Sequence, residues 1–404
     1  MMVVAKSGFN ISASAPTDKC FSSANGTKSP TTLPLNNSFL NLDQGDPTVF
    51  ESFWRELNDE CTVVIKGSDL LSYLSDTGNV CWFLLPELRD AVKRLHNVVG
   101  NAVTEKKHIV VGTGSTQLFQ AALFALSSPD SPHPMNVVAA APYYSEYKDE
   151  VEVVLSRLYK WSGDANVFDK DEAYIEVVTS PNNPDGTLRG PVVKSRAEGK
   201  LVYDFAYYWP QYTPITHKAD HDIMLFTFSK CTGHAGSRIG WAIVKDIEVA
   251  EKMTRYIQMS SIGVSKESQT RVAKIMQVIC DNYQNFGYAE SKLFFQHSKR
   301  LMVKRWKKLN EAIKQSDVFT VAKSQRAYCH FTKELSETYP AFAWLKCKEG
   351  IEDCESYFRK LKIITRGGER FGADAKYARL SMLCKDEVFD EFLTRLSNIK
   401  WVSN

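Results

Sequence analysis

A lysine and an arginine follow a buried apolar run near the middle of the chain. The run "IMLFTFS" covers residues 223–229, Lys230 comes directly after it, and Arg238 ends the small-residue stretch "CTGHAGSR". Burial disfavours the charged form of an amine and lowers its pKa, and a neutral amine can form a Schiff base with an aldehyde. A guanidinium group can hold a phosphate by two hydrogen bonds. These two residues therefore point to chemistry on a phosphorylated aldehyde.

Two further groups that such chemistry requires occur upstream. Pyridoxal phosphate is the chief biological aldehyde that pairs with a lysine, and it needs an acid at its pyridine nitrogen and a cup for its phosphate. Asp204 stands inside the apolar run "KLVYDFAYY", where a buried carboxylate calls for a cationic partner. The run "VVGTGSTQLFQAA" predicts a strand, a glycine turn and a helix that begins near Ser115, so that the hydroxyls of Ser115 and Thr116 meet backbone N–H groups at an anion site.

Each of these features also has a simpler structural interpretation. A lysine stem often covers apolar surface, and Asp204, Ser115 or Thr116 could cap a helix. The run "TSPNNPDGT", in which Asn183 could donate to the phenolic oxygen of the cofactor, could be a β-turn alone. The hypothesis of cofactor chemistry rests on the occurrence of lysine, acid, cup and arginine together in one chain.

Short apolar runs alternate with helical patterns around these residues. Several runs are apolar on both faces, as strands buried between two helix layers must be. Helical stripes lie between them, with apolar residues three or four apart. We therefore predict an α/β fold with a largely parallel sheet between helices. The predicted strands cover residues 108–112, 136–142, 173–181, 200–208, 223–229 and 239–244.

Changes in composition predict four parts of the chain. Residues 1–38 are rich in Ser, Thr, Ala, Asn and Pro, and we expect them to form a disordered leader. We expect residues 86–290 to form a large cofactor-binding domain and residues 291–404 a smaller α+β domain. The segment 39–85 is expected to pack with the small domain, which would place a cleft between the two parts.

The composition excludes several classes of function. Fifty Lys and Arg against 47 Asp and Glu give a net charge of +3, which argues against nucleic acid as a partner. No apolar run approaches the roughly 18 residues of a membrane span. The nine cysteines are scattered without a CxxC spacing, which indicates neither a metal site nor a disulfide framework and favours a reducing compartment, here taken as the cytoplasm.

The motifs around Lys230 resemble those of a known family. "SK" followed by "GxRxG", with "NNPDG" and "DFAY" upstream, resembles fold type I pyridoxal-phosphate aminotransferases, which implies their fold and cofactor. Longer runs narrow the resemblance to the plant alliinase-like group, and within it to plant tryptophan aminotransferases. These runs lie between about residues 39 and 400 and include "NLDQGDPT", "VVGTGSTQL", "SPNNPDGT", "DFAYYWPQYTPIT", "TGHAGSRIGWA" and "YPAFAWL".

The resemblance implies roles for the residues of a cofactor site. Lys230 matches the lysine of the Schiff base, which moves the substrate α-proton as base and acid. Asp204 matches the acid at the pyridine nitrogen, and Tyr144, the second residue after Pro142, matches the aromatic that stacks on the ring. The other implied cofactor contacts are Asn183 and Tyr207 at the phenolate oxygen, Ser115, Thr116 and Arg238 at the phosphate, and Thr227, which replaces the usual serine three residues before the lysine.

Three further residues are implied to contact the substrate or a second subunit. Arg379, in "YARLSML", matches the arginine that binds the substrate α-carboxylate. Gly45, in "LDQGDP", falls where the family closes its backbone over the substrate. Tyr73, in "SYLSD", resembles a tyrosine that reaches the phosphate of the neighbouring subunit, so the resemblance implies a homodimer with the active site at the interface.

The implied reaction moves the amino group of L-tryptophan, or of another aromatic amino acid, to pyruvate or another 2-oxo acid. The product from tryptophan is indole-3-pyruvate, a precursor of auxin. Two alternatives stay open, namely an alliinase-like C–S lyase and a binding protein that does not turn over. Secreted alliinases carry an N-terminal cysteine-rich domain, whereas the leader here has only Cys20, and a binding protein would be expected to lose Lys230 or Arg379.

Overall fold

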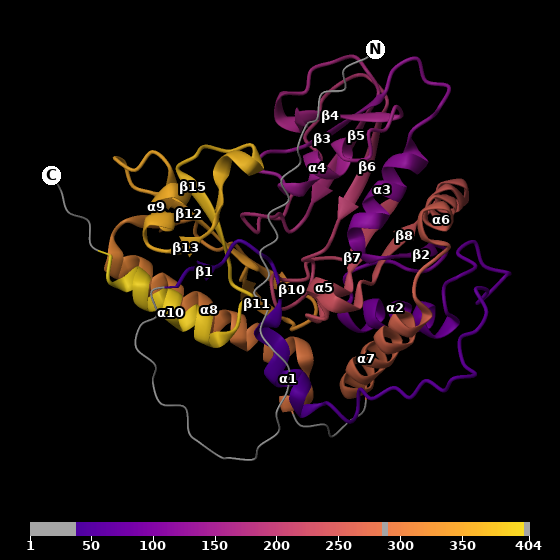
Figure 1. Cartoon of the computed structure of the whole chain (residues 1–404), viewed down its shortest axis with the longest axis horizontal. Coiled ribbons are helices and arrows are strands. Elements are labelled where there is room, and N and C mark those ends of the chain that lie inside the picture. The colour runs from indigo at the N-terminus through magenta and orange to yellow at the C-terminus, as the bar shows by residue number, and fades with distance from the viewer. Residues whose placement is uncertain (1–37, 285–289, 400–404) are drawn as a thin grey trace, which may run out of the picture. The chain divides into compact units, whose positions relative to one another are not determined.

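The computed structural model describes residues 38–284 and 290–399 (Figure 1). From Phe39 onward the described residues belong to one compact unit. The predicted leader lies outside the described residues except for Ser38. The predicted domain boundaries at residues 86 and 291 stay predictions.

A seven-stranded sheet forms the centre of the fold. Its strand order is β2-β8-β7-β6-β5-β3-β4, and all neighbouring pairs are parallel except the two that involve β8. This arrangement confirms the predicted α/β fold with a mostly parallel sheet. The strands are β2 (His108–Gly112), β3 (Met135–Ala139), β4 (Tyr159–Asp164), β5 (Tyr174–Thr179), β6 (Gly199–Asp204), β7 (Ile223–Thr227) and β8 (Gly240–Val244).

Helices pack against this sheet and against one another (Figure 1). Helices α3 and α6 pack together and contact β2 and β8, and α2 packs along α7. Helices α8 and α10 pack together in the C-terminal part. The helices are α1 (Glu51–Glu56), α2 (Pro86–Val99), α3 (Gly114–Leu126), α4 (Glu146–Glu152), α5 (Phe228–Cys231), α6 (Ile247–Ser261), α7 (Lys266–Gln284), α8 (Phe294–Ser316), α9 (Cys354–Lys360) and α10 (Asp386–Ser397).

A smaller, antiparallel sheet of order β14-β15-β12-β9 lies in the C-terminal part. The N-terminal strand β1 pairs in parallel with β13, which brings Leu40 beside Ile363. The remaining strands are β1 (Leu40–Asn41), β9 (Phe319–Val321), β10 (Arg326–Cys329), β11 (Glu334–Glu337), β12 (Phe342–Cys347), β13 (Ile363–Ile364), β14 (Arg366–Gly367) and β15 (Tyr377–Ser381).

One predicted strand limit differs from the structure in a way that matters for function, and one strand was not predicted. Strand β6 ends at Asp204, because residues 205–208 leave the sheet and bury their aromatic rings elsewhere in the core. Asp204 therefore stands at the carboxyl end of a parallel strand rather than inside one. The sequence analysis missed strand β4, since its sequence "YKWSGD" is polar and it lies at the edge of the sheet.

The expectation that the cysteines form no disulfide is wrong at one place. Cys347, at the end of β12, and Cys354, at the start of α9, form a disulfide with their Cα atoms 5.8 Å apart. Within residues 38–284 and 290–399 the other six cysteines are free, and no group of His, Cys, Asp and Glu could hold a metal ion. Within the same residues no helix is long and apolar enough to cross a membrane.

A fully buried histidine joins helix α2 to the sheet. His96 Nδ1 lies 2.7 Å from Asn101 Oδ1, and its Nε2 accepts the indole N–H of Trp241 at 2.9 Å. Because Asn101 Oδ1 can only accept and Trp241 can only donate, the ring is held neutral with its proton on Nδ1. Burial lowers the pKa of His96 to about 4, although the hydrogen bond with Asn101 opposes the shift.

This histidine should make stability fall as the pH falls from about 6.5 to 4. The unfolded chain takes up a proton near the ordinary pKa of histidine, whereas folded His96 stays neutral to about pH 4, so its contribution is complete above pH 6.5 and is lost below it. We expect a loss of about 2 kcal/mol between pH 7.5 and pH 5, measured by urea denaturation. His96→Gln should have a lower free energy of unfolding at pH 7.5, and that free energy should depend less steeply on pH than in the wild type. An equally steep dependence in both proteins would contradict this account.

Candidate active site

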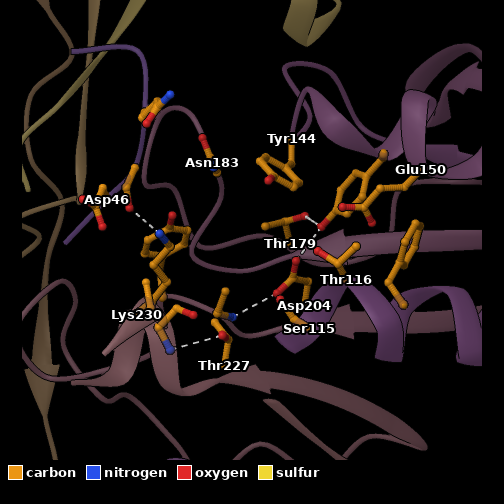
Figure 2. A pocket seen from close by; sticks show the side chains of 18 of the residues that line it. Asp46, Ser115, Thr116, Tyr144, Glu150, Thr179, Asn183, Asp204, Thr227 and Lys230 are labelled. Atoms are coloured by element: carbon orange, nitrogen blue, oxygen red, sulfur yellow. Dashed lines mark hydrogen bonds between the residues drawn. The ribbon is translucent and has the colours of Figure 1, made fainter. Parts of the chain in front are cut away.

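One cavity of about 280 Å³ collects most of the predicted site residues (Figure 2). It lies at the carboxyl ends of β5, β6 and β7 and at the first turn of α3, where parallel strands commonly present ligand-binding groups. The predicted residues that line it are Gly45, Ser115, Thr116, Tyr144, Asn183, Asp204, Tyr207, Thr227, Lys230 and Arg238.

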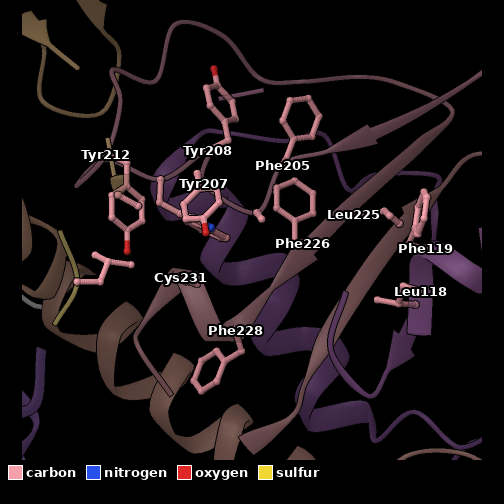
Figure 3. Close-up of a cluster of buried hydrophobic side chains, with 14 of the residues drawn as sticks. Leu118, Phe119, Phe205, Tyr207, Tyr208, Tyr212, Leu225, Phe226, Phe228 and Cys231 are labelled. Atoms are coloured by element: carbon pink, nitrogen blue, oxygen red, sulfur yellow. The ribbon is translucent and has the colours of Figure 1, made fainter. Parts of the chain in front are cut away.

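Lys230 is held at the cavity by the short helix α5. Strand β7 ends at Thr227, whose hydroxyl accepts the N–H of Ser229 at 3.3 Å and so starts the helix. Phe228 and Cys231, on either side of this turn, are buried in the core (Figure 3). Two buried anchors leave the lysine side chain directed into the cavity, where Nζ donates a hydrogen bond to the carbonyl of Gly45.

The surroundings of Lys230 favour a neutral amine. Burial lowers the pKa of Lys230 to about 8, the positive charges of Arg379 and Arg238 act in the same direction, and Asp46 opposes them. No described acid forms an ion pair with Lys230. A large fraction of the amine is therefore unprotonated near pH 8, as attack on an aldehyde requires.

Asp204 ends strand β6, which pairs with the strand β7 that leads into α5 and Lys230, and it lines the same cavity. Its Oδ1 accepts the N–H of Ala206 at 3.0 Å, and its Oδ2 accepts the hydroxyl of Tyr147 at 2.7 Å. The Tyr147 oxygen also lies 2.7 Å from the hydroxyl of Thr179, which can donate to it. Burial raises the pKa of Asp204, and no basic side chain in the described part of the chain pairs with it.

The phosphate cup is built from α3 and the loop before β8. Gly114 begins α3 with a φ of +75°, and Ser115 and Thr116 follow it at the cavity wall. A Cβ atom at Gly114 would lie 2.5 Å from Nη2 of Arg238, so only glycine leaves room for this guanidinium. Arg238 Nη1 donates one hydrogen bond to the carbonyl of Ala235 at 3.1 Å. Helix N–H groups, two hydroxyls and an arginine thus face one place that suits a dianion.

Asn183 and Arg379 act as a pair at the other end of the cavity. Arg379 Nη1 donates to Asn183 Oδ1 at 3.0 Å, which fixes the amide so that its NH₂ group remains for another acceptor. Arg379 Nη2 donates to the carbonyl of Asp43 at 2.5 Å, and its buried Nε has no partner among the described residues. Arg379 does not line the cavity itself but contacts a residue that does.

The described residues fit pyridoxal phosphate. Asp204 is a carboxylate without a basic partner, which suits a protonated ring nitrogen. Lys230 would hold the aldehyde, the cup at α3 the phosphate, and the free amide of Asn183 the phenolate oxygen. Of the two tyrosines after Pro142, it is Tyr144 that lines the cavity.

The structure does not bring Tyr73 to this site. Its side chain is 71% exposed, in a segment where Val64, Leu71 and Leu74 are exposed as well. Within a single chain, Tyr73 therefore has no role at the cavity. Its predicted role at the phosphate of a second subunit stays a prediction.

Sequence reasoning missed several polar residues of the cavity, among them Asp46, Tyr147 and Glu150. Tyr147 comes three residues after Tyr144, a spacing that places both on one side of a helical turn and could have revealed it. The carboxyl of Glu150 has its pKa raised to about 8 by burial, against a hydrogen bond from Thr116. At neutral pH the neutral form predominates, which avoids a second negative charge beside the phosphate cup.

Tyr147 should control how tightly the cofactor is held. Tyr147→Phe removes the hydroxyl that orients Asp204, and a hydrogen bond to a charged group contributes about 1.5–3 kcal/mol. We expect the affinity for pyridoxal phosphate, measured by fluorescence titration, to fall about 10- to 100-fold. Tyr256→Phe is the matched control, since that hydroxyl bonds to Gln120 away from the cavity. Equal affinities for both variants would exclude a positioning role.

Known proteins are similar to this chain over most of its length. The protein-family model described as "Allinase" matches residues 40–400. "Tryptophan aminotransferase-related protein 1" of Oryza sativa subsp. japonica is 53% identical over 89% of this chain and 83% of its own length. "Tryptophan aminotransferase-related protein 2" of Arabidopsis thaliana is 53% identical over 90% and 82%. "Alliin lyase" of Allium cepa var. aggregatum is 36% identical over 86% and 79%.

Solved structures match the fold. A methionine aminotransferase from Escherichia coli superposes with a TM-score of 0.62 at 14% identity, over 89% of this chain and 94% of its own. An aspartate aminotransferase from Thermus thermophilus with maleate superposes with a TM-score of 0.59 at 18% identity, over 89% of this chain and 91% of its own. The fold is therefore that of the fold type I aminotransferases, whose cofactor is pyridoxal phosphate. Together with the match over residues 40–400, these findings show that the chain belongs to the alliinase family.

Proposed function

We propose that the protein is an aminotransferase that moves the amino group of L-tryptophan, or of another aromatic amino acid, to pyruvate or another 2-oxo acid. The observation that carries the proposal is the placement of Asp204, at the end of β6, and Lys230, on the short helix α5 that follows the adjacent strand β7, at one cavity beside an anion cup. An amine of lowered pKa and a carboxylate without a basic partner are the two groups that amino-group transfer on pyridoxal phosphate requires.

Each residue at or beside the cavity would have its own role in the proposed reaction. Pyridoxal phosphate, when bound, supplies an electron sink for the negative charge that develops at the substrate α-carbon. Lys230 would anchor the cofactor at rest, and its amine would move the proton from the substrate α-carbon to the former aldehyde carbon of the cofactor, as base and acid. Asp204 holds a proton on the ring nitrogen. Arg379, whose guanidinium contacts Asn183 at the cavity wall, would bind the substrate carboxylate and orient the α-hydrogen toward Lys230.

The relatives favour tryptophan as the amino donor. Relatives whose names contain "tryptophan aminotransferase-related" reach 53% identity, whereas the relatives named "alliin lyase" reach 35–37%. The product from tryptophan would be indole-3-pyruvate, and a role in auxin biosynthesis follows from that chemistry. We propose that this reaction takes place in the cytoplasm.

We further propose that the active form is a homodimer. The segment around Tyr73 exposes several large apolar side chains, and Lys266 at the start of α7 holds its backbone by a hydrogen bond to the carbonyl of Leu74. A second copy would cover these side chains and bring Tyr73 to the phosphate cup of its partner.

The test is a pair of half-reactions followed by absorbance. The purified protein with bound cofactor receives L-tryptophan alone and then pyruvate alone. We expect the visible band of the cofactor to disappear with tryptophan and to return with pyruvate, with indole-3-pyruvate and alanine as the products. A band that never changes with any amino acid would support a binding protein instead.

A C–S lyase is the second candidate, because alliin lyases belong to the same family. The same residues could remove the α-proton and then allow a sulfur leaving group to depart from the β-carbon. Release of pyruvate from an S-alkyl cysteine sulfoxide, without any change on adding tryptophan, would replace the aminotransferase by this lyase.

A further inference from the structure

Two arginines stand directly opposite each other beside the active site. Strands β14 and β15 pair in an antiparallel register that aligns Arg366 with Arg379. Residues aligned in this way project from the same face of a sheet, with their Cβ atoms about 5 Å apart. Arg366 is therefore the direct cross-strand neighbour of Arg379, the residue that we assign to the substrate carboxylate.

The two arginines differ in what holds them. Arg366 Nε and Nη2 donate to both carboxylate oxygens of Asp43, at 2.5 and 3.2 Å, and its Nη1 donates to Ser145 and forms an ion pair with Glu146. Arg379 instead donates to neutral oxygens and comes only within 3.8 Å of the Asp43 carboxylate. The positive charge of Arg366 is thus neutralised by two acidic side chains. Arg379 forms no comparably close ion pair, so its positive charge can attract a ligand carboxylate.

The compensation has a physical reason. Like charges directly opposite each other on paired strands destabilise the sheet. Burial lowers the pKa of Arg379, and the charge of Arg366 lowers it further. Asp43 shields one arginine from the other because it contacts both. Burial strengthens these interactions, since the side chain of Arg366 is only 14% exposed and that of Arg379 only 2%.

We propose that Asp43 and Glu146 determine the charge class of the substrate by neutralising Arg366, so that the site accepts amino acids and 2-oxo acids with one carboxylate and discriminates against dicarboxylic ones. This inference rests on the proposed aminotransferase. A second substrate carboxylate needs a second cation near Arg379. Lys230 and Arg238 serve the cofactor, which leaves Arg366 as the basic residue nearest to Arg379 in the described sheet.

Removing one acid should admit dicarboxylic substrates. Glu146→Gln keeps the size of the side chain but leaves Arg366 with one acid. We expect the ratio of kcat/KM for 2-oxoglutarate to that for pyruvate to rise about tenfold. Asp43→Asn should shift the ratio in the same direction. Asp149→Asn is the matched control, because it removes the same charge from an exposed position of α4 and should leave the ratio unchanged.

A second variant tests whether Arg366 itself is the cation. In Glu146→Gln combined with Arg366→Gln, the gain for 2-oxoglutarate should vanish. An unchanged ratio in Glu146→Gln, or an equal rise in Asp149→Asn, would overturn the proposal. A gain that persists without Arg366 would also overturn it.

Binding provides a measurement that does not depend on turnover. Isothermal titration of the cofactor-loaded protein with glutarate and with pentanoate compares a dicarboxylate and a monocarboxylate of equal length. The wild type should bind pentanoate more tightly, and Glu146→Gln should reverse or level this preference. If the wild type transfers no amino group at all, the proposed function fails, whereas an unchanged preference for pentanoate in Glu146→Gln makes only the present inference fail.

Discussion

Replacing Lys230 with alanine should lower the turnover of tryptophan and pyruvate by about 10⁴-fold or more. The variant loses both the amine that anchors the cofactor and the group that moves the α-proton, and each of these contributes separately to the rate. No other described lysine lines the cavity, so no side chain nearby can replace it. Single-turnover kinetics of the cofactor-loaded variant would measure the effect, and a small primary amine added to the solution should restore part of the rate.

Lys107→Ala is the matched control for this experiment. The side chain of Lys107 is only 4% exposed and pairs with Asp220 at 2.5 Å, away from the cavity. Its loss should reduce stability without changing the rate per folded molecule. If Lys230→Ala kept more than about a hundredth of the wild-type rate, Lys230 would not be the group that moves the proton.

Replacing Asp204 with asparagine should reduce kcat by about 10²- to 10³-fold. An amide cannot stabilise a positive charge on the ring nitrogen, and removal of one electrostatic partner from a preorganised site has effects of this size. The asparagine oxygen can accept from either the Tyr147 hydroxyl or the Ala206 N–H, so the variant keeps the shape of the side chain and loses one of its two hydrogen bonds. Steady-state kinetics gives kcat, and the absorbance of the bound cofactor reports the altered protonation of the ring.

Glu176→Gln serves as the control for Asp204. Glu176 is a carboxylate on the neighbouring strand β5 and is only 1% exposed, but it accepts the N–H groups of Val192 and Val193 rather than facing the cavity. Its replacement should lower stability and leave the spectrum of the cofactor unchanged. Equal kcat values for Asp204→Asn and wild type would exclude contact between Asp204 and the ring.

The fold and the main line of site residues could be predicted because the signals are local. Residues 223–227 are all buried, and such two-sided burial is visible in the sequence as an almost wholly apolar run. A polar residue at the end of such a run lies at the carboxyl end of a strand, where parallel strands commonly present ligand-binding groups. Lys230 and Asp204 could be placed in this way without a structure.

Other residues could not be predicted because their partners are far away in the sequence. Arg366 meets Asp43 across 323 positions and Glu146 across 220, and neither contact leaves a pattern in the chain. The disulfide between Cys347 and Cys354 has a spacing that no standard motif uses. Strand β4 is polar because one of its edges is unpaired, so periodicity did not reveal it.

The hydrogen bond between Asn183 and Arg379 has a consequence for genetic variants of this protein. The Asn183 amide, which we propose contacts the cofactor, and the Arg379 guanidinium, which we propose binds the substrate, share one hydrogen bond, so loss of either side chain should disturb both ligands. Effects of substitutions at the two positions will therefore not add. A variant at position 183 can resemble a loss of substrate affinity, and its harm can be hidden when position 379 is already altered.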